Sequence, residues 1–441
     1  MNVVVAKTET GRALSDAFAV ARERLPGKGA IAEQRRQAFE AYERAGLPHR
    51  RIEDWKYTDL RALMREVLPL APAPDAAALT RAATAAKSVA IAGARRVVLV
   101  DGVFAPSLSD LAGLDKGLNI RSLREVLEGA DTALAAEALT SDAANPMIAL
   151  NGAMATDGVV VDIVEGTVLS QPIQIVHIAS AQAPAAMFTR SLVRLGRDTV
   201  ATLVESYAAA DGAKAYQAHD GLVVSIGDNA RLDHVRVVED ALDAFNISSA
   251  NVSLGAHAHF NTFGLTSGAS VSRYQLTIAF AGQGSKVETN GVNLLNGKQH
   301  ADTTLFMDHA VPHCDSREIF RAVVDDRAHS VFQGRIIVRP DAQKTDAKMM
   351  TRALLLSDEA EADNKPELEI FADDVTCGHG ATTGALDESL LFYLRARGLP
   401  EKDAQALLIQ AFVGEAIEQI ASDELREFAI LTAQRWLEAR A

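Results

Sequence analysis

The sequence predicts a mainly β protein built on a solenoid, with a helical region on each side of it. Short strands rich in Val, Ile and Thr alternate with Gly, Asn and Asp turns for more than 200 residues beyond Asp157. One type of turn recurs at Gly196, Gly227, Gly255 and Gly284, at intervals of 31, 28 and 29 residues. A fixed period of this length with no helix inside it is typical of a solenoid, in which each coil stacks on the previous one.

A β-sandwich or a β-barrel would also show short strands separated by turns, and this alternative stays open on the pattern alone. Two features favour the solenoid. One turn type recurs at one interval, and the dipeptides typical of tight hairpins are too few for an antiparallel meander.

Helical patterns flank the β-rich region. Upstream, apolar residues recur at helical spacing. Downstream, Asp387 is placed to cap one helix, Pro400 begins a second, and Ser422 begins a third. Three helices of this size do not form a stable domain alone, so we expect them to dock on the solenoid end or on a partner. The expected domains are a mainly helical region over 1–150, the solenoid over 151–385 and a helical region over 386–441.

Composition and charge exclude several classes of protein. The net charge of −14, without clustered Lys and Arg, argues against nucleic-acid binding and against a basic helix on a membrane surface. The chain has no apolar run of about 18 residues, so we expect no membrane span. Only Cys314 and Cys377 are present, and the N-terminus lacks the features of a signal peptide. A reducing cytoplasm is therefore the expected location.

Several nucleotide and redox motifs are missing from the sequence. It contains no Gly-x-x-x-x-Gly-Lys-Ser/Thr loop, so we expect no ATP to bind to this chain itself. No dinucleotide fingerprint opens a helix, and no Cys-x-x-Cys pair occurs. We therefore expect that the chain is not an ATPase, a dinucleotide-dependent enzyme or a dithiol oxidoreductase.

The densest group of metal-ligand residue types is His309, His313 and Cys314. Zinc or iron could bind such a group. However, Pro312 prevents the helix that would bring the two histidines onto one face, and no glutamate lies between them to act as a base. A plain loop is the alternative, and the role of these residues stays open.

Cys377 and His379 form a second group, which the sequence places on a turn that also contains Gly378 and Gly380. Thiolate and imidazole are suitable ligands for Fe²⁺ or for an iron–sulfur cluster. Two ligands cannot complete a site, because tetrahedral iron wants about four. The others would come most economically from a second protein. The alternative is a buried cysteine beside a histidine bonded to backbone.

The chain resembles the SufB/SufD family of iron–sulfur cluster assembly scaffolds, and specifically its SufD branch. An N-terminal signature and a nearly continuous C-terminal set of motifs carry the resemblance. These segments are Glu53–Thr58, Val331–Val338, Ala342–Ala347, Leu354–Ser357, Pro366–Ile370, Asp373–Thr382 and Leu391–Gly398.

The resemblance implies a right-handed parallel β-helix between two helical regions, and a noncatalytic role in an ATP-driven complex. It implies a SufB-like paralogue as a heterodimer partner and a SufC-like ABC-type ATPase that docks on 386–441. It also implies that His379, as a metal ligand, helps to hold iron or a nascent cluster together with a cysteine of the paralogue. Cys377 is a further candidate ligand, reduced flavin is a candidate cofactor of the complex, and a homodimer is an alternative state of the isolated chain.

The residues leave two alternatives to the scaffold. A β-helix enzyme acting on polysaccharides would use acids such as Asp325, Asp326, Asp373 or Asp374, but such enzymes are secreted and line their grooves with aromatics. Aromatic residues make up only 5% of this chain. The other alternative is a purely structural solenoid.

Overall fold

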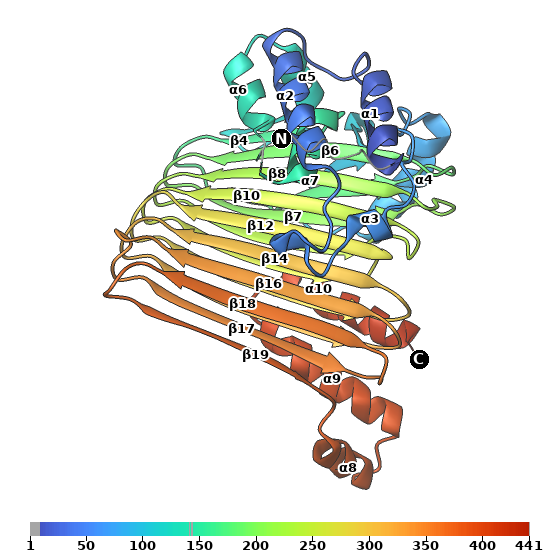
Figure 1. Cartoon of the computed structure of the whole chain (residues 1–441), viewed down its shortest axis with the longest axis vertical. Helices are drawn as coiled ribbons and strands as arrows, with labels where there is room; N and C mark the ends of the chain where they lie inside the picture. Colours follow the sequence, from blue (N-terminus) through green and yellow to red (C-terminus); the bar gives the residue numbers. More distant parts are fainter. Residues whose placement is uncertain (1–8, 141, 143, 441) are drawn as a thin grey trace, which may run out of the picture.

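Two long sheets face each other and form a flattened parallel β-solenoid, as the sequence predicts (Figure 1). The computed structural model describes residues 9–140, 142 and 144–440. The chain passes from one sheet to the other at every turn, so each coil adds one strand to each sheet. From β4 to β19 the strands pair in parallel, while β1 with β2 and β3 with β4 are antiparallel.

The two sheets are named here after their last strands. The β19 sheet contains, in spatial order, β19 (Thr376–Gly384), β17 (Asp346–Leu355), β15 (Asp315–Val324), β13 (Lys286–Leu295), β11 (His259–Thr266), β9 (Arg231–Glu239), β7 (Val200–Ala209), β5 (Ile173–Ala179), β1 (Arg95–Val100) and β2 (Val103–Phe104). The β18 sheet contains β18 (Glu361–Ile370), β16 (His329–Val338), β14 (His300–His309), β12 (Val271–Phe280), β10 (Phe245–Leu254), β8 (Gln217–Ile226), β6 (Ala186–Leu195), β4 (Val159–Ile163) and β3 (Leu118–Ser122).

Helices gather at the first coils and along the outer face of the β19 sheet (Figure 1). Among the helices that the structure describes, none is long and apolar enough to cross a membrane. The upstream helices are α1 (Glu9–Ala21), α2 (Ala30–Ala45), α3 (Leu60–Leu63), α4 (Ala76–Ser88), α5 (Leu123–Glu128), α6 (Thr132–Ala138) and α7 (Pro146–Met154). The downstream helices are α8 (Glu388–Ala396), α9 (Glu401–Ile417) and α10 (Asp423–Ala439).

Stacked glycines explain the sequence period. A Cβ added to Gly227 would lie 2.8 Å from the carbonyl carbon of Gly196, and one added to Gly255 would lie 3.0 Å from that of Gly227. The next glycine in this column is Gly282, where a Cβ would lie 2.3 Å from the carbonyl carbon of Gly255. Gly284, which the period suggested, has a φ of 72° and lies against His257 instead. Glycine is needed in the column because successive backbones approach too closely for a side chain.

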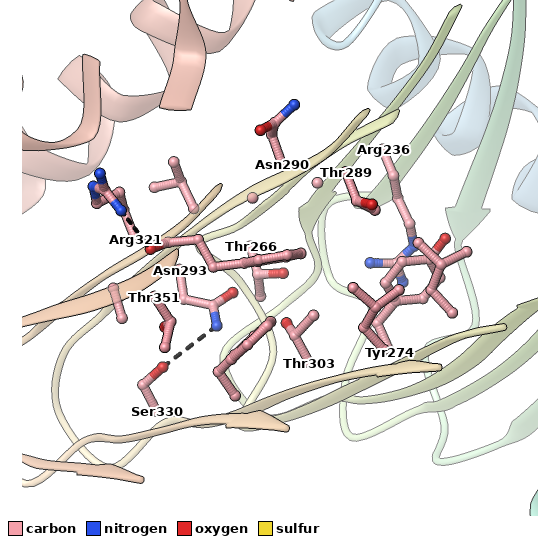
Figure 2. Close-up of a pocket in the computed structure, with 18 of the residues that line it drawn as sticks. Arg236, Thr266, Tyr274, Thr289, Asn290, Asn293, Thr303, Arg321, Ser330 and Thr351 are labelled. Atoms are coloured by element: carbon pink, nitrogen blue, oxygen red, sulfur yellow. Dashed lines mark hydrogen bonds between the residues drawn. The ribbon is translucent and has the colours of Figure 1, made fainter. Parts of the chain in front are cut away.

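The lumen between the sheets is apolar along one side and polar along the other. Leu, Val, Ile and Phe side chains from both sheets fill the apolar side. Small polar side chains surround a cavity of about 30 Å³ on the other side, and Figure 2 shows Asn293 donating to the Ser330 hydroxyl at 3.4 Å. The solenoid therefore encloses hydrogen-bonding groups as well as a hydrophobic core.

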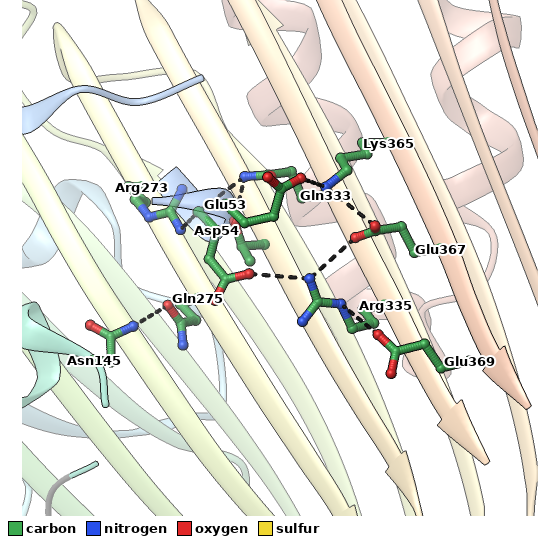
Figure 3. A network of polar contacts seen from close by, with 11 residues as sticks. Glu53, Asp54, Asn145, Arg273, Gln275, Gln333, Arg335, Lys365, Glu367 and Glu369 are labelled. Atoms are coloured by element: carbon green, nitrogen blue, oxygen red, sulfur yellow. Dashed lines mark hydrogen bonds and ion pairs between the residues drawn. The ribbon is translucent and has the colours of Figure 1, made fainter. Parts of the chain in front are cut away.

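The segment Glu53–Thr58 lies against the outer face of the β18 sheet and holds several coils together (Figure 3). The carbonyl oxygen of Asp54 accepts hydrogen bonds from Arg273 on β12, at 2.7 Å, and from Gln333 on β16, at 3.2 Å. Glu53 forms an ion pair with Lys365 on β18. The N-terminal region thus contacts strands that lie more than 200 residues away in the sequence.

Trp55 anchors this segment. Its side chain is buried, and the guanidinium of Arg273 lies 3.7 Å from its ring centroid. Arg273 is itself buried and forms an ion pair with Asp302 on β14. A desolvated cation–π contact of this kind contributes about 2 kcal/mol, so Trp55 helps to fix the register of the segment.

Helices α9 and α10 dock on the outer face of the β19 sheet, and the expectation that they cover the solenoid end is wrong for these two. Their apolar side chains form one core with outward residues of the strands. Glu415 on α9 also pairs with Arg321, at 2.5 Å, and with Arg352, at 3.6 Å. This face buries the helices because the outward positions of β9 to β17 are themselves rich in Val and Leu.

Ser422 caps α10, as the sequence predicts, and its hydroxyl accepts a hydrogen bond from the backbone N–H of Leu425 at 3.3 Å. We expect Ser422→Ala to lower the free energy of unfolding by about 1 kcal/mol, because it leaves that N–H without its partner. Chemical denaturation measures the change. Ser422→Asp, which keeps an acceptor at the cap, should remain close to the wild type, and an equal loss in both variants would contradict the capping role.

Candidate functional site

Cys377 and His379 lie on β19, the last strand of its sheet. The prediction of a turn at these residues is wrong, because 376–384 is a regular strand in register with β17. Cys377 pairs with Ala347, and His379 pairs with Met349. A Cβ added at Gly380 would lie 2.6 Å from the side chain of Met350. Glycine is therefore needed here because the Met350 side chain occupies the space, and not because the backbone adopts a positive φ.

Because the two residues are two positions apart on one strand, they share a face of the sheet. Cys377 is half-buried against the apolar lumen, and burial raises the pKa of its thiol. His379 is exposed. The strand therefore presents one soft ligand at the mouth of the lumen and a second one in solvent beside it.

A pocket of about 530 Å³ opens at this edge. Several residues with metal-ligating side chains contribute to its lining, namely Cys377, His379, Glu318, Met349 and Met350. Met349 and Met350 are neighbours on β17, so their side chains project to opposite faces of the sheet. Gln419, which follows α9, lines the pocket from the helical side. The pocket can admit a small ion or a cluster, and it is open to a second protein at the solenoid end.

Glu318 was not among the residues that the sequence suggested. It lies on β15 and is 1% exposed, and neither carboxylate oxygen has a hydrogen-bond partner in the part of the chain that the structure describes. Burial raises its pKa to about 8. A buried acid of this kind destabilises the fold. Glu318 is therefore a candidate functional group, because strongly shifted pKa values cluster at functional sites.

His309, His313 and Cys314 do not form a shared site. His309 faces the lumen, lies 4.3 Å from the ring of Phe280, and has its Nε2 3.1 Å from the Ser316 hydroxyl. Burial lowers its pKa to about 4. His313 is exposed in a turn, and Cys314 is buried with a raised thiol pKa, also because of burial. Among the described residues, the ligand atoms of these three do not come close enough together to share a metal ion.

The acidic residues considered for a polysaccharide enzyme lie in turns. Asp325 forms an ion pair with Arg440, which follows α10. Asp374 pairs with Lys344 of the preceding coil, and the backbone N–H of Asp374 donates to Gln343. These contacts stabilise coil corners, and the two pairs of acids follow different strands, β15 and β18.

Known protein families decide between the remaining interpretations. The model described as "SUF system FeS cluster assembly, SufBD core domain" matches residues 177–412, and that of the SufBD protein N-terminal region matches 15–175. The chain belongs to the SufBD family. It is an iron–sulfur cluster assembly protein of this family and is SufD-like.

Individual SufBD relatives match over most of the chain. It is 32% identical over 385 residues to an iron–sulfur cluster assembly SufBD family protein of Synechocystis sp., covering 85% of this chain and 84% of the relative. It is 29% identical over 405 residues to the iron–sulfur cluster assembly protein SufD of Escherichia coli K12, covering 89% and 90%. The chloroplastic protein ABCI7 of Arabidopsis thaliana is 29% identical over 293 residues, covering 64% of this chain and 60% of the relative.

Proposed function

We propose that this SufBD protein is a noncatalytic scaffold subunit that supports iron acquisition and de novo cluster assembly at an interface with a SufB-like paralogue. One observation carries the proposal: the two sheets end at β18 and β19, where Cys377 and His379 offer two of the roughly four ligands that a cluster needs. The paralogue would supply the others. His379 is the primary ligand in this proposal, and Cys377 is the secondary one.

The end of the solenoid suits a protein partner. Strands β18 and β19 are the last of their sheets, and terminal strands present backbone groups that pair with another chain. Ile370, the last residue of β18, and Phe371, which follows it, leave large apolar surface in solvent. A paralogue with the same fold would continue both sheets across the interface. A second copy of this chain is the alternative occupant in the absence of the paralogue.

The C-terminal region would bind the SufC-like ATPase. Helix α8 lies at the same end of the molecule as β19 (Figure 1), and it contributes no buried residue. Instead Leu390, Phe392 and Tyr393 expose their side chains. ATP binding and hydrolysis would take place on the ATPase and would change the solenoid interface through these helices. Reduced flavin is a candidate cofactor of the assembled complex in this proposal.

We expect Phe392→Asp to weaken binding of the ATPase at least about tenfold, since it places a charge in the apolar contact. Phe392 is 74% exposed, so the fold should be unaffected. Val20→Asp on α1, at 72% exposure, is the matched control and should bind as the wild type does. Titration calorimetry with purified ATPase measures both. Equal affinity of wild type and Phe392→Asp would remove α8 from the interface.

Coexpression tests the proposed function as a whole. The chain is produced with a SufB-like paralogue and a SufC-like ATPase, and the purified material is analysed without oxygen for iron and acid-labile sulfide. We expect the three proteins to copurify with bound cluster. Cluster formation at the wild-type level when this chain is omitted would contradict the proposal. The cytoplasm is the proposed location, because both cysteines, Cys314 and Cys377, are free thiols.

A further inference from the structure

A second group of potential metal ligands lies inside the lumen, far along the solenoid from β19. His177 on β5, Glu205 on β7 and Asp220 on β8 all point inward, and one ligand atom of each lies within 4.8 Å of the others. Glu205 and Asp220 are almost completely buried. Ligand types from both sheets therefore converge on one point that solvent does not reach freely.

One atom of this group has no partner among the described residues. The Nε2 of His177 is buried without a hydrogen bond to any of them, although its ring is held in place by stacking on Tyr207 at 4.4 Å. The Tyr207 hydroxyl lies 2.8 Å from Asp220 and 3.3 Å from Glu205. An oriented imidazole nitrogen that lacks a partner beside two carboxylates is the arrangement that a bound cation satisfies.

The balance of charge also favours a cation. Three carboxylates, those of Glu205, Asp220 and Asp240, face this part of the lumen, and Arg236 provides a positive charge. The guanidinium of Arg236 donates to Asn246 at 3.0 Å and to Ser248 at 2.5 Å rather than to a carboxylate. Carboxyl groups therefore outnumber the guanidinium in this part of the lumen, among the described residues. Buried charge is costly unless it is neutralised.

Neighbouring groups hold the carboxylates in place for such a role. Asp220 also accepts a hydrogen bond from Thr189 at 2.5 Å. Glu205 lies 3.0 Å from Nε2 of His234. A small cavity with room for a water molecule adjoins His177, Asp220 and Tyr207. Space and supporting hydrogen bonds are both present.

We propose that His177, Glu205 and Asp220 bind one divalent transition-metal ion inside the solenoid. One imidazole nitrogen and two carboxylates suit Zn²⁺, Fe²⁺ or Mn²⁺. The ion would cross-link β5, β7 and β8 and offset the negative charge of the two carboxylates. This site is independent of the proposed function, because it shares no residue with the pocket at β19.

The test uses the full chain carrying Cys377→Ala and His379→Ala, so that the outer ligands cannot contribute. Metal is removed with a strong chelator, Zn²⁺, Fe²⁺ or Mn²⁺ is added separately, and bound metal is measured by elemental mass spectrometry after gel filtration. We expect about one ion per chain for at least one of the metals, and a rise in melting temperature on reloading.

Further substitutions in that chain identify the ligands. His177→Gln and Asp220→Asn should each lower metal affinity at least about tenfold. His219→Gln is the matched control, because His219 is a buried histidine next to Asp220 that stacks on Phe188 at 4.4 Å, on the opposite face of β8. Its metal content should be unchanged.

Two outcomes overturn the proposal. One is a parent chain that binds none of the three ions and melts at the same temperature before and after chelation. The other is a His177→Gln variant that retains full occupancy. If the ligand variants fail to fold, the metal content and melting temperature of the chain with only Cys377→Ala and His379→Ala, measured after chelation and after reloading, test the proposal alone.

Discussion

Replacement of His379 by alanine is expected to leave the complex assembled and to abolish cluster formation. His379 is exposed on the terminal strand, so its removal costs the fold almost nothing. The site, in contrast, loses one of about four ligands, and a cluster held by three is not retained. Anaerobic iron and sulfide analysis of the purified complex, together with its visible absorption, measures the loss.

His313→Ala is the matched control for this variant. His313 is also an exposed histidine near the lower coils, but it lies in the turn before β15 and outside the pocket. Cluster yield in this variant should equal that of the wild type. If His379→Ala also gave the wild-type yield, His379 would not be a ligand. Cys377→Ala tests whether Cys377, the second candidate, is also a ligand. A cluster yield close to that of the wild type would leave His379 as the only ligand from this chain.

Replacement of Glu318 by glutamine is expected to stabilise the fold increasingly as the pH rises. The carboxyl ionises near pH 4.5 in the unfolded chain but near pH 8 in the fold, because burial raises its pKa. Between these values the folded state binds the extra proton, so wild-type stability falls as the pH increases. Glutamine does not titrate. The variant should therefore gain roughly 3 kcal/mol relative to wild type between pH 5 and pH 8.

Denaturant melts at pH 5, 6.5 and 8 measure this difference. Glu288→Gln is the control for the loss of a carboxylate from the same pocket, because Glu288 lines that pocket but is only half-buried. The same difference for Glu318→Gln at pH 5 and at pH 8 would show that the carboxyl is already ionised in the fold. A stabilised variant with lower cluster yield would show that the buried acid is kept for function at the expense of stability.

The solenoid was predictable because its period is imposed by close backbone contact. Successive coils meet at Gly196, Gly227 and Gly255, where a side chain does not fit, so the requirement is visible in the sequence. The position of the C-terminal helices was not predictable. Their apolar faces show that they dock, but the surface that receives them is assembled from outward residues of strands far apart in sequence.

The candidate site was predictable in its residues and not in its conformation. Cys377 and His379 stand out as soft ligands, yet Thr376–Gly384 contains three glycines, which weaken the preference for a strand. Its pairing with β17 imposes the strand. Glu318 was hidden because both faces of β15 mix polar and apolar residues, so alternation alone does not show which face is inward.

Native mass spectrometry of the anaerobic complex is the most direct test of a cluster shared between this chain and a SufB-like paralogue. The complex is prepared with wild-type chain and with His379→Ala, and the intact masses are compared. We expect both chains to appear in a heteromeric complex with the paralogue and the ATPase, and the added mass of iron and sulfide only in the wild-type complex. A chain found only by itself, or equal iron and sulfide in both complexes, would contradict the shared site.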